Sequence, residues 1–186
     1  MKEMKSVEDL YKYLLTFDYG YWYDGKRYTG KNIEYNWDHY HTISPDNFVK
    51  HKVGTCWDYS EFEYLWIKEN HPELNPQMWY IETIDSDGVR PTHTWVSYEE
   101  DGLTKVIEVS WAAQQGIHAY KSVDSMLDNY SKKHCESHGT NAYVVFKIPP
   151  VKRYGLTPGV YMLKAWCGKR VRKVGKIPDY PIEYKK

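Results

Sequence analysis

THTWVSYEEDGLTKVIEVSW (residues 92–111) contains two strand-like runs joined by a turn, and it decides which kind of sheet the chain can form. Valine, isoleucine, threonine and aromatic residues are typical of strands. Asp101-Gly102, between the two runs, is a strong signal for a two-residue hairpin turn, which joins antiparallel strands. The stretch therefore predicts an antiparallel pair over 92–98 and 104–111.

Patterns on both sides of this hairpin predict helices followed by more strands. Residues 18–44 are rich in Tyr, Trp, Gly and Asn and predict a loop with a short hairpin at Asp24-Gly25. The other predicted elements are helices beginning near Ser6, Ser44, Thr55, Ser122 and Thr157, and strands over 78–84 and 143–148. Helices that precede an antiparallel sheet predict the α+β fold class.

The bulk composition is that of one globular domain. The chain has 186 residues, of which 41% are hydrophobic and 27% charged. We expect a single domain over 1–186, with a core at about 44–148 and a basic C-terminal extension over 149–186. Residues 1–136 hold 14 Lys/Arg and 23 Asp/Glu, a net charge of −9, whereas residues 137–186 hold 11 and 2, a net charge of +9. The basic part is expected to pack on the acidic body. A nucleic-acid or other anionic partner is the alternative, although no nucleic-acid motif accompanies it.

The N-terminus and the cysteines favour a cytoplasmic location. MKEMKSVEDL is charged and lacks the apolar core of a signal peptide, and no run approaches the ~18 apolar residues of a membrane span. Three widely spaced cysteines do not form the pattern of a disulfide framework.

VGTCWDYSEF (residues 53–62) places a cysteine at the start of a predicted helix. Thr55 is a suitable cap and Asp58 its reciprocal partner three residues later, so Cys56 falls at the first helical position. The apolar face of this helix carries Tyr59, Phe62 and Trp66, with Glu63 inside the stripe, while Asp58, Glu61, Lys68 and Glu69 are expected to point away.

The hairpin register predicts a pair of residues that share one face of the sheet. With Asp101-Gly102 as the turn, Glu100 pairs with Leu103, and counting back places Trp95 opposite Glu108. His93 and Glu108 are then diagonal neighbours on one face, about 7–8 Å apart at the backbone. Glu108 can thus accept a hydrogen bond from the His93 ring, and a one-residue slip of register would abolish this contact.

Cys56, His93 and Glu108 together have the chemistry of a nucleophilic triad. A helix N-terminus and a nearby imidazole both favour the thiolate, and a carboxylate orients the imidazole. The first helical amides can stabilise an oxyanion.

These motifs resemble the transglutaminase-like superfamily of papain-like cysteine enzymes. GTCWDYSEF, THTWVSY and VIEVSW follow each other in the superfamily's order, and the match covers 53–120, including GIHAY at 116–120, which is similar to uncharacterised bacterial and phage-type members. The resemblance implies a nucleophile helix packed on an antiparallel sheet, with Cys56 as nucleophile, His93 as base and Glu108 as orienting acid. The acid is usually Asp in this superfamily, and Glu108 departs from that pattern.

Several other residues are assigned alternative roles. Trp57, Trp95 and Trp111 flank the triad, and each either packs in the core or lines a substrate groove. Asn36, Trp37 and Asn47 are the candidates for an oxyanion side chain. His134, Cys135 and His138 form an H-C-x-x-H cluster, but no fourth zinc ligand is evident and a solvated helix end is expected instead. No cofactor, zinc or calcium site is expected.

The sequence therefore predicts a cysteine-dependent acyl-transfer enzyme with a protein or peptide substrate. A thioester on Cys56 would be resolved by water, in hydrolysis of a peptide, isopeptide or side-chain amide, or by an amine. The alternatives are an inactive relative that binds a peptide or protein, and an adaptor that binds nucleic acid through the basic extension.

Overall fold

The computed structural model describes residues 4–30, 38–151 and 153–179, and it shows an α+β fold built on a six-stranded antiparallel sheet. The strand order is β7-β6-β5-β4-β8-β9. The strands are β4 (Gln77–Thr83), β5 (Thr92–Glu100), β6 (Leu103–Glu108), β7 (Gly116–Tyr120), β8 (Tyr143–Ile148) and β9 (Lys169–Val174).

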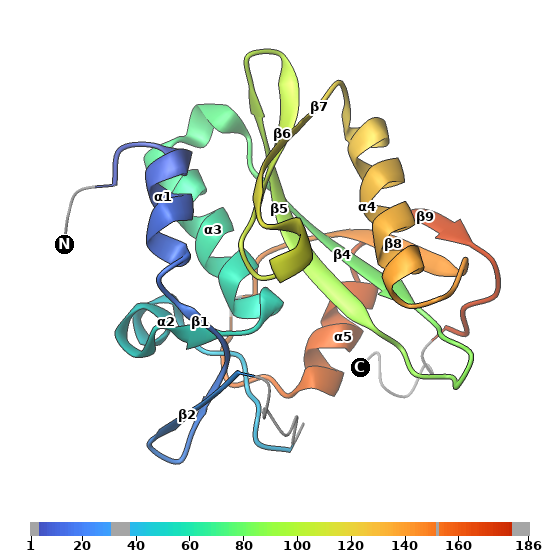
Figure 1. Cartoon of the computed structure of the whole chain (residues 1–186), viewed down its shortest axis with the longest axis horizontal. Helices are drawn as coiled ribbons and strands as arrows, with labels where there is room; N and C mark the ends of the chain where they lie inside the picture. The colour runs from blue at the N-terminus through green and yellow to red at the C-terminus, as the bar shows by residue number, and fades with distance from the viewer. Residues whose placement is uncertain (1–3, 31–37, 152, 180–186) are drawn as a thin grey trace.

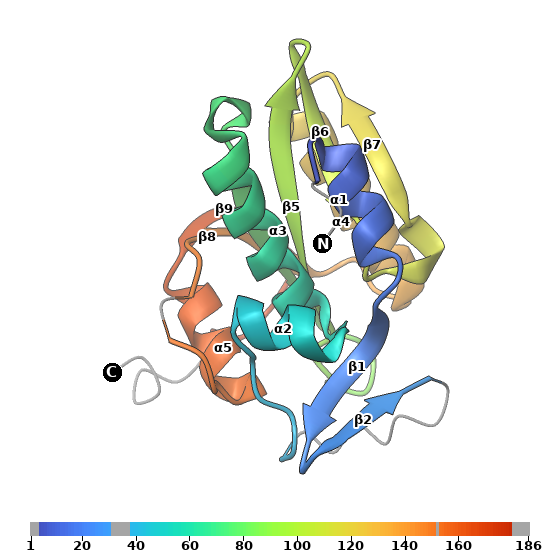
Figure 2. The same ribbon diagram turned by 90° about the vertical axis from the view of Figure 1, so that its left-hand side faces the viewer.

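Helices cover both faces of this sheet. α1 (Val7–Leu14), α2 (Pro45–His51), α3 (Cys56–Asn70) and α5 (Pro158–Trp166) lie on one side, and α4 (Val123–Ser137) lies on the other (Figure 1, Figure 2). The 3-10 turns η1 (Pro72–Leu74) and η2 (Ala112–Gln114) follow α3 and β6. A small second sheet has the order β2-β1-β3, from β1 (Asp18–Tyr23), β2 (Lys26–Thr29) and β3 (Val53–Gly54).

The β5–β6 hairpin has the predicted register. Glu100 pairs with Leu103 and Val96 pairs with Ile107. Asp101 and Gly102 both have positive φ angles, 54° and 73°, as a two-residue turn of this type requires. Alternate residues therefore face opposite sides, so that Val96 and Ile107 lie in the core under α1 and α3, whereas Trp95 and Val106 lie in the core under α4.

The sheet is anchored to its helices by aromatic packing and by one buried polar contact. The Trp95 ring stacks on Tyr130 of α4 with centroids 4.9 Å apart. On the other face, the Ser60 hydroxyl of α3 donates to the Thr94 carbonyl oxygen at 2.9 Å. This bond holds the first turns of α3 against the beginning of β5.

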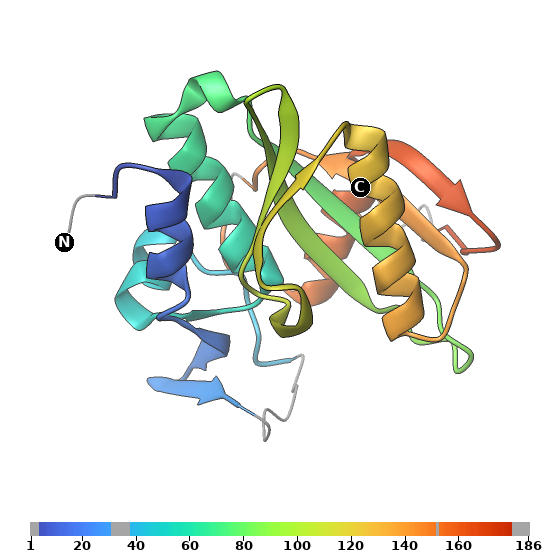
Figure 3. The same cartoon turned by 45° about the horizontal axis from the view of Figure 1, so that its top comes forward.

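The basic C-terminal part contributes to the sheet and to the core. β9 pairs with β8, and Tyr161, Trp166 and Ile177 are buried in the same core as α1 and α3. Figure 3 shows α4 lying across the sheet beside β9. Arg172 of β9 forms ion pairs with Asp124 and Asp128 of α4, which joins the basic part to the acidic body.

Two side chains of α3 differ from the prediction. Asp58 and Glu61 were expected to point away from the core, but they are only 3% exposed each. α3 is covered on several sides, by α2, by β5 and by the segments that precede α2 and follow β8, so a single apolar stripe does not describe its environment. β3, β7 and β9 were not predicted, and no helix in the described part of the chain is long and apolar enough to cross a membrane.

Candidate active site

Cys56 is the first residue of α3, and the residues around it fix this helix end. Thr55 and Asp58 form the predicted capping box, in which the Thr55 amide donates to Asp58 Oδ2 at 2.9 Å. Asp58 also accepts from the Ile43 amide and from the Tyr40 hydroxyl, each at 3.0 Å. Burial raises the pKa of Asp58 to about 6, against the opposing effect of these hydrogen bonds. The cap therefore also binds the segment that precedes α2.

Gly54 lets α2 approach the start of α3. A Cβ atom at Gly54 would lie 2.6 Å from Phe48 Cε2 and 2.8 Å from Asp58 Cβ, which is too close for carbon atoms. Only glycine fits here without displacing Phe48, which lies in the core. The glycine before the cysteine thus has a packing role that is specific to this helix start.

His93 and Glu108 form a buried hydrogen-bonded pair on neighbouring strands. His93 Nε2 lies 2.7 Å from Glu108 Oε2, as the predicted register requires. The second carboxylate oxygen, Oε1, accepts from the Ser110 hydroxyl at 3.1 Å and from the Trp111 amide at 2.9 Å. Glu108 is therefore held by groups on both of its oxygens, and it fixes the orientation of the His93 ring.

Cys56 lies close enough to His93 to influence the pKa of the same imidazole. Burial by itself lowers the pKa of His93, but the negative charge of Glu108, its hydrogen bond to the ring and the neighbouring Cys56 outweigh burial and raise that pKa to about 10. Because Nε2 faces Glu108, Nδ1 is the ring nitrogen left for the thiol. Cys56, His93 and Glu108 are thus brought together in the order thiol, imidazole, carboxylate.

All three side chains are nearly enclosed. Cys56 and His93 are each 6% exposed, and Glu108 is 2% exposed. Low exposure strengthens the interaction between charges because little water screens them.

The three predicted groove tryptophans occupy different environments. Trp57 and Trp95 are 3% and 1% exposed and pack in the core, so neither lies on an open groove wall. The Trp57 ring stacks on Tyr161 of α5, with centroids 4.4 Å apart. Trp111 is partly exposed and stands edge-on to the His93 ring at 5.2 Å. Trp111 is therefore the tryptophan positioned to contact a bound substrate.

Glu63 is a buried acid near the triad for which the sequence prediction gave no role. It is 2% exposed, and its Oε1 atom has no hydrogen-bond partner among the described residues. Burial raises the pKa of Glu63 well above its usual value, and the charge of Glu108 adds to this effect. The charged form of Glu63 is therefore disfavoured in the folded chain. Its position inside the apolar stripe of the helix was the signal for this burial.

The H-C-x-x-H cluster lies at the C-terminal end of α4, where His138 is exposed as expected but His134 and Cys135 are buried. His134 and Cys135 are 3% and 7% exposed, and the His134 ring lies 6.4 Å from the His93 ring. Burial, together with the nearby His93, lowers the pKa of His134 well below its usual value. Over the ranges that the structure describes, no three His, Cys, Asp or Glu residues are grouped to hold a metal ion.

The structure describes one of the three side chains that were candidates for the oxyanion hole. Asn36 and Trp37 lie outside the described residues, and Asn47 is exposed in the first turn of α2. The donors that the structure does place at Cys56 are the first backbone amides of α3, because amides in the first turn of a helix have no partner within the helix.

No protein-family model matches the chain, and no curated protein matches it. The geometry of Cys56, His93 and Glu108 therefore carries the inference about function.

Proposed function

We propose that the chain is a cysteine-dependent acyl-transfer enzyme with a papain-like, transglutaminase-like core. Its catalytic residues are Cys56, His93 and Glu108, and its substrate is a peptide, isopeptide or side-chain amide of a protein. The proposal rests on the 2.7 Å contact between His93 Nε2 and Glu108 Oε2. It is supported by the nearby Cys56, which helps to raise the pKa of the same ring.

The reaction follows from the roles that these groups can play. His93 takes the thiol proton at Nδ1, and Cys56 Sγ bonds to the carbonyl carbon while the carbonyl electron pair moves to oxygen. The first amides of α3 stabilise this oxyanion. When the carbon–nitrogen bond breaks, His93 returns the proton to the leaving amine, and the acyl group stays on Cys56 as a thioester. Water or a second amine then attacks the thioester and releases the thiol.

Glu108 has an electrostatic and positioning role in this scheme. Its charge favours the imidazolium that forms after proton transfer, and its hydrogen bond holds the ring so that Nδ1 faces the thiol. The arrangement suits the first half of the reaction, and it leaves the choice between water and an amine to the acceptor that reaches the thioester.

Alkylation by iodoacetamide across a pH series, followed by peptide mapping, tests the proposal. We expect Cys56 to be alkylated faster than Cys167 at neutral pH, because a helix N-terminus and a neighbouring imidazole both favour thiolate attack. Cys167, which is exposed, provides the internal reference for an ordinary thiol. Incubation with an activated ester should add one acyl group to Cys56, and this adduct should be absent from Cys56→Ala and present in Cys167→Ala.

A peptide-binding scaffold without turnover is the second candidate function, and the 6% exposure of Cys56 favours it. In that case Cys56 would react no faster than Cys167 at any pH, and the activated ester would leave no acyl group on it. Either result would overturn the enzymatic proposal.

A further inference from the structure

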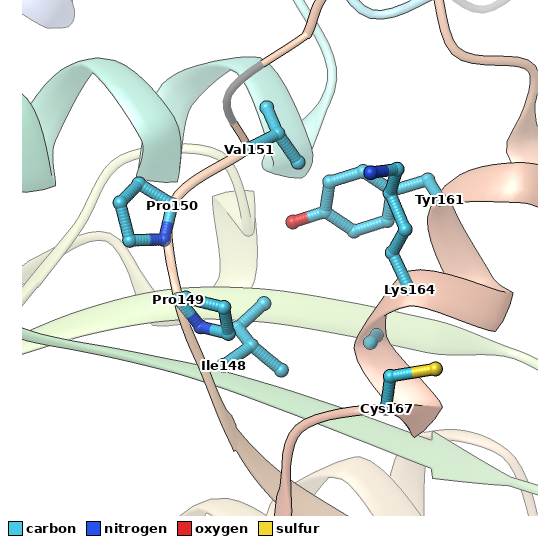
Figure 4. A pocket seen from close by; sticks show the side chains of 8 residues that line it. Ile148, Pro149, Pro150, Val151, Tyr161, Lys164 and Cys167 are labelled. Atoms are coloured by element: carbon cyan, nitrogen blue, oxygen red, sulfur yellow. The ribbon is translucent and has the colours of Figure 1, made fainter.

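A pocket of about 400 Å³ opens between the end of β8 and α5, away from the triad. One side is formed by Ile148, Pro149, Pro150 and Val151, and the other by Tyr161, Lys164, Ala165 and Cys167 (Figure 4). Its volume falls within the range of roughly 300–1,000 Å³ that is usual for small-ligand sites. Most of the lining is apolar, so the body of a fitting ligand is apolar as well.

Tyr161 supplies a buried polar group at this pocket. The residue is 1% exposed, and Figure 4 shows its hydroxyl directed into the space between the two walls. The hydroxyl groups of Tyr161 and Thr94 lie beside each other, but neither makes a hydrogen bond of ordinary geometry within the described residues. Because this hydroxyl has almost no accessible surface, Tyr161 contributes to the pocket mainly as a wall.

Lys164 supplies a positive charge at the same pocket. It is exposed on α5 and forms no ion pair with any residue that the structure describes. The surrounding sequence has no acidic residue from Ser137 to Pro178 to compete for this ammonium group. The acid nearest to the wall is Glu61, which accepts from the Val151 amide at 3.0 Å. Burial raises the pKa of Glu61 to about 7, so this group carries little negative charge in slightly acidic solution.

We propose that this pocket is a binding site for an apolar chain that ends in a carboxylate. The chain lies against Ile148, Pro149, Val151 and Ala165, and the carboxylate pairs with Lys164. A fatty-acid-type carboxylate and the apolar C-terminal residue of a peptide share this chemistry. The proposal does not depend on the acyl-transfer proposal, because Cys56, His93 and Glu108 are not among the residues that line the pocket.

A titration of the intact chain with octanoate tests this site. It is carried out at a pH below the pKa of Glu61 and is followed by the chemical shifts of the backbone amides in NMR spectra. We expect saturable binding with shifts concentrated at 148–151 and 161–167. 1-Octanol should bind about tenfold more weakly, because it lacks the charge that pairs with Lys164. A comparison of acetyl-leucine with acetyl-leucine amide tests in the same way whether the C-terminal residue of a peptide binds. If only octanoate or only acetyl-leucine binds, the ligand is a fatty-acid-type carboxylate or a peptide C-terminus, respectively.

Two substitutions separate the charge from the pocket. Lys164→Met keeps the apolar stem and should weaken octanoate binding about tenfold while leaving 1-octanol unchanged. Lys176→Met, at an exposed lysine outside the pocket, is the matched control and should change neither. The proposal is overturned if neither carboxylate binds saturably, if octanoate and 1-octanol bind equally well, or if the two lysine variants behave alike. The assay measures binding alone, so its failure would leave the proposed function standing.

Discussion

At the scale of single residues, the buried aspartate and glutamate side chains have different roles although their carboxyl groups are chemically alike. Glu108 is held by three donors, one of them His93, whereas Glu63 Oε1 has no partner among the described residues and burial raises the pKa of this acid. Their environments, and not their identities, decide which of them carries charge.

Glu108→Gln should lower the reactivity of Cys56 while leaving the fold intact. The amide fills the same space but removes the charge that raises the pKa of His93, so less imidazolium is available to stabilise the thiolate. We expect the alkylation rate of Cys56 at neutral pH to fall about tenfold or more, since one pKa unit corresponds to a factor of ten. Circular dichroism should be unchanged.

Glu63→Gln is the matched control for this substitution. Because burial disfavours the charged form of Glu63, its amide should leave the alkylation rate close to that of the parent chain. Equal losses in both variants would indicate a general effect of disturbing the core. No loss in Glu108→Gln would show that another residue orients His93.

Glu61 should make the chain more stable in mildly acid solution than in alkaline solution. Its folded pKa of about 7 lies above the usual 4.5 of a glutamate side chain, so between these values the folded state binds a proton that the unfolded state has lost. Stability is then highest at the acid end of this window and falls as the pH rises through about 7. Across the window the loss is about 3 kcal/mol.

Glu61→Gln should flatten this dependence, because the amide does not titrate and can still accept from the Val151 amide. Urea unfolding of both chains on either side of pH ~7 measures the difference. Parallel pH profiles for the two chains would show that Glu61 does not titrate in this window.

At the scale of elements, the decisive feature is the short connection from α2 through β3 into α3. Gly54 gives α2 room, Thr55 and Asp58 cap α3, and Asp58 binds the segment before α2. The position of Cys56 is thus set by packing and hydrogen bonding that involve both helices.

Gly54→Ala should destabilise the chain by about 1–3 kcal/mol, because the new methyl group must displace Phe48 or the start of α3. Gly159→Ala is the control, since a Cβ atom there meets nothing within 4 Å and alanine favours a helix. Thermal unfolding should show a lower midpoint for the first variant and an equal or higher one for the second. The reverse order would contradict the packing role of Gly54.

At the scale of the whole molecule, one buried charge joins the sheet to the C-terminal part. Glu82 of β4 is 0% exposed and accepts from the Tyr80 hydroxyl at 2.7 Å and from Trp166 Nε1 of α5 at 2.8 Å. Arg90, in the connection from β4 to β5, pairs with Glu82 and also donates to the Pro178 carbonyl oxygen at 2.8 Å. Elements that are far apart in the sequence meet at this carboxylate.

Arg90→Met should cost about 3–5 kcal/mol of stability, because it leaves the buried Glu82 without its counter-charge. Adding Glu82→Gln should recover much of this loss, since the amide can still accept from Tyr80 and Trp166. Chemical unfolding of the single and double variants measures the coupling. Additive losses would show that the two residues do not act as a pair.

The sequence alone determined the features that depend on neighbouring residues. The Asp101-Gly102 turn set the register of the hairpin and with it the pairing of His93 with Glu108. Side chains alternate between the two faces of a strand, so a slip of one residue would move the buried side chains to the other face. The cap at Thr55 and Asp58 likewise follows from a spacing of three residues, and it placed Cys56 at the start of α3.

Only the tertiary structure decided what surrounds those features. The approach of Cys56 to His93, the burial of Asp58, Glu61 and Glu63, and the packing of Trp57 against Tyr161 all join segments far apart in the chain. β7 and β9 escaped prediction for the same reason, since an edge strand with few buried side chains is defined by its partner more than by its own pattern. Local spacing fixes register and caps, whereas burial is a property of the assembled fold.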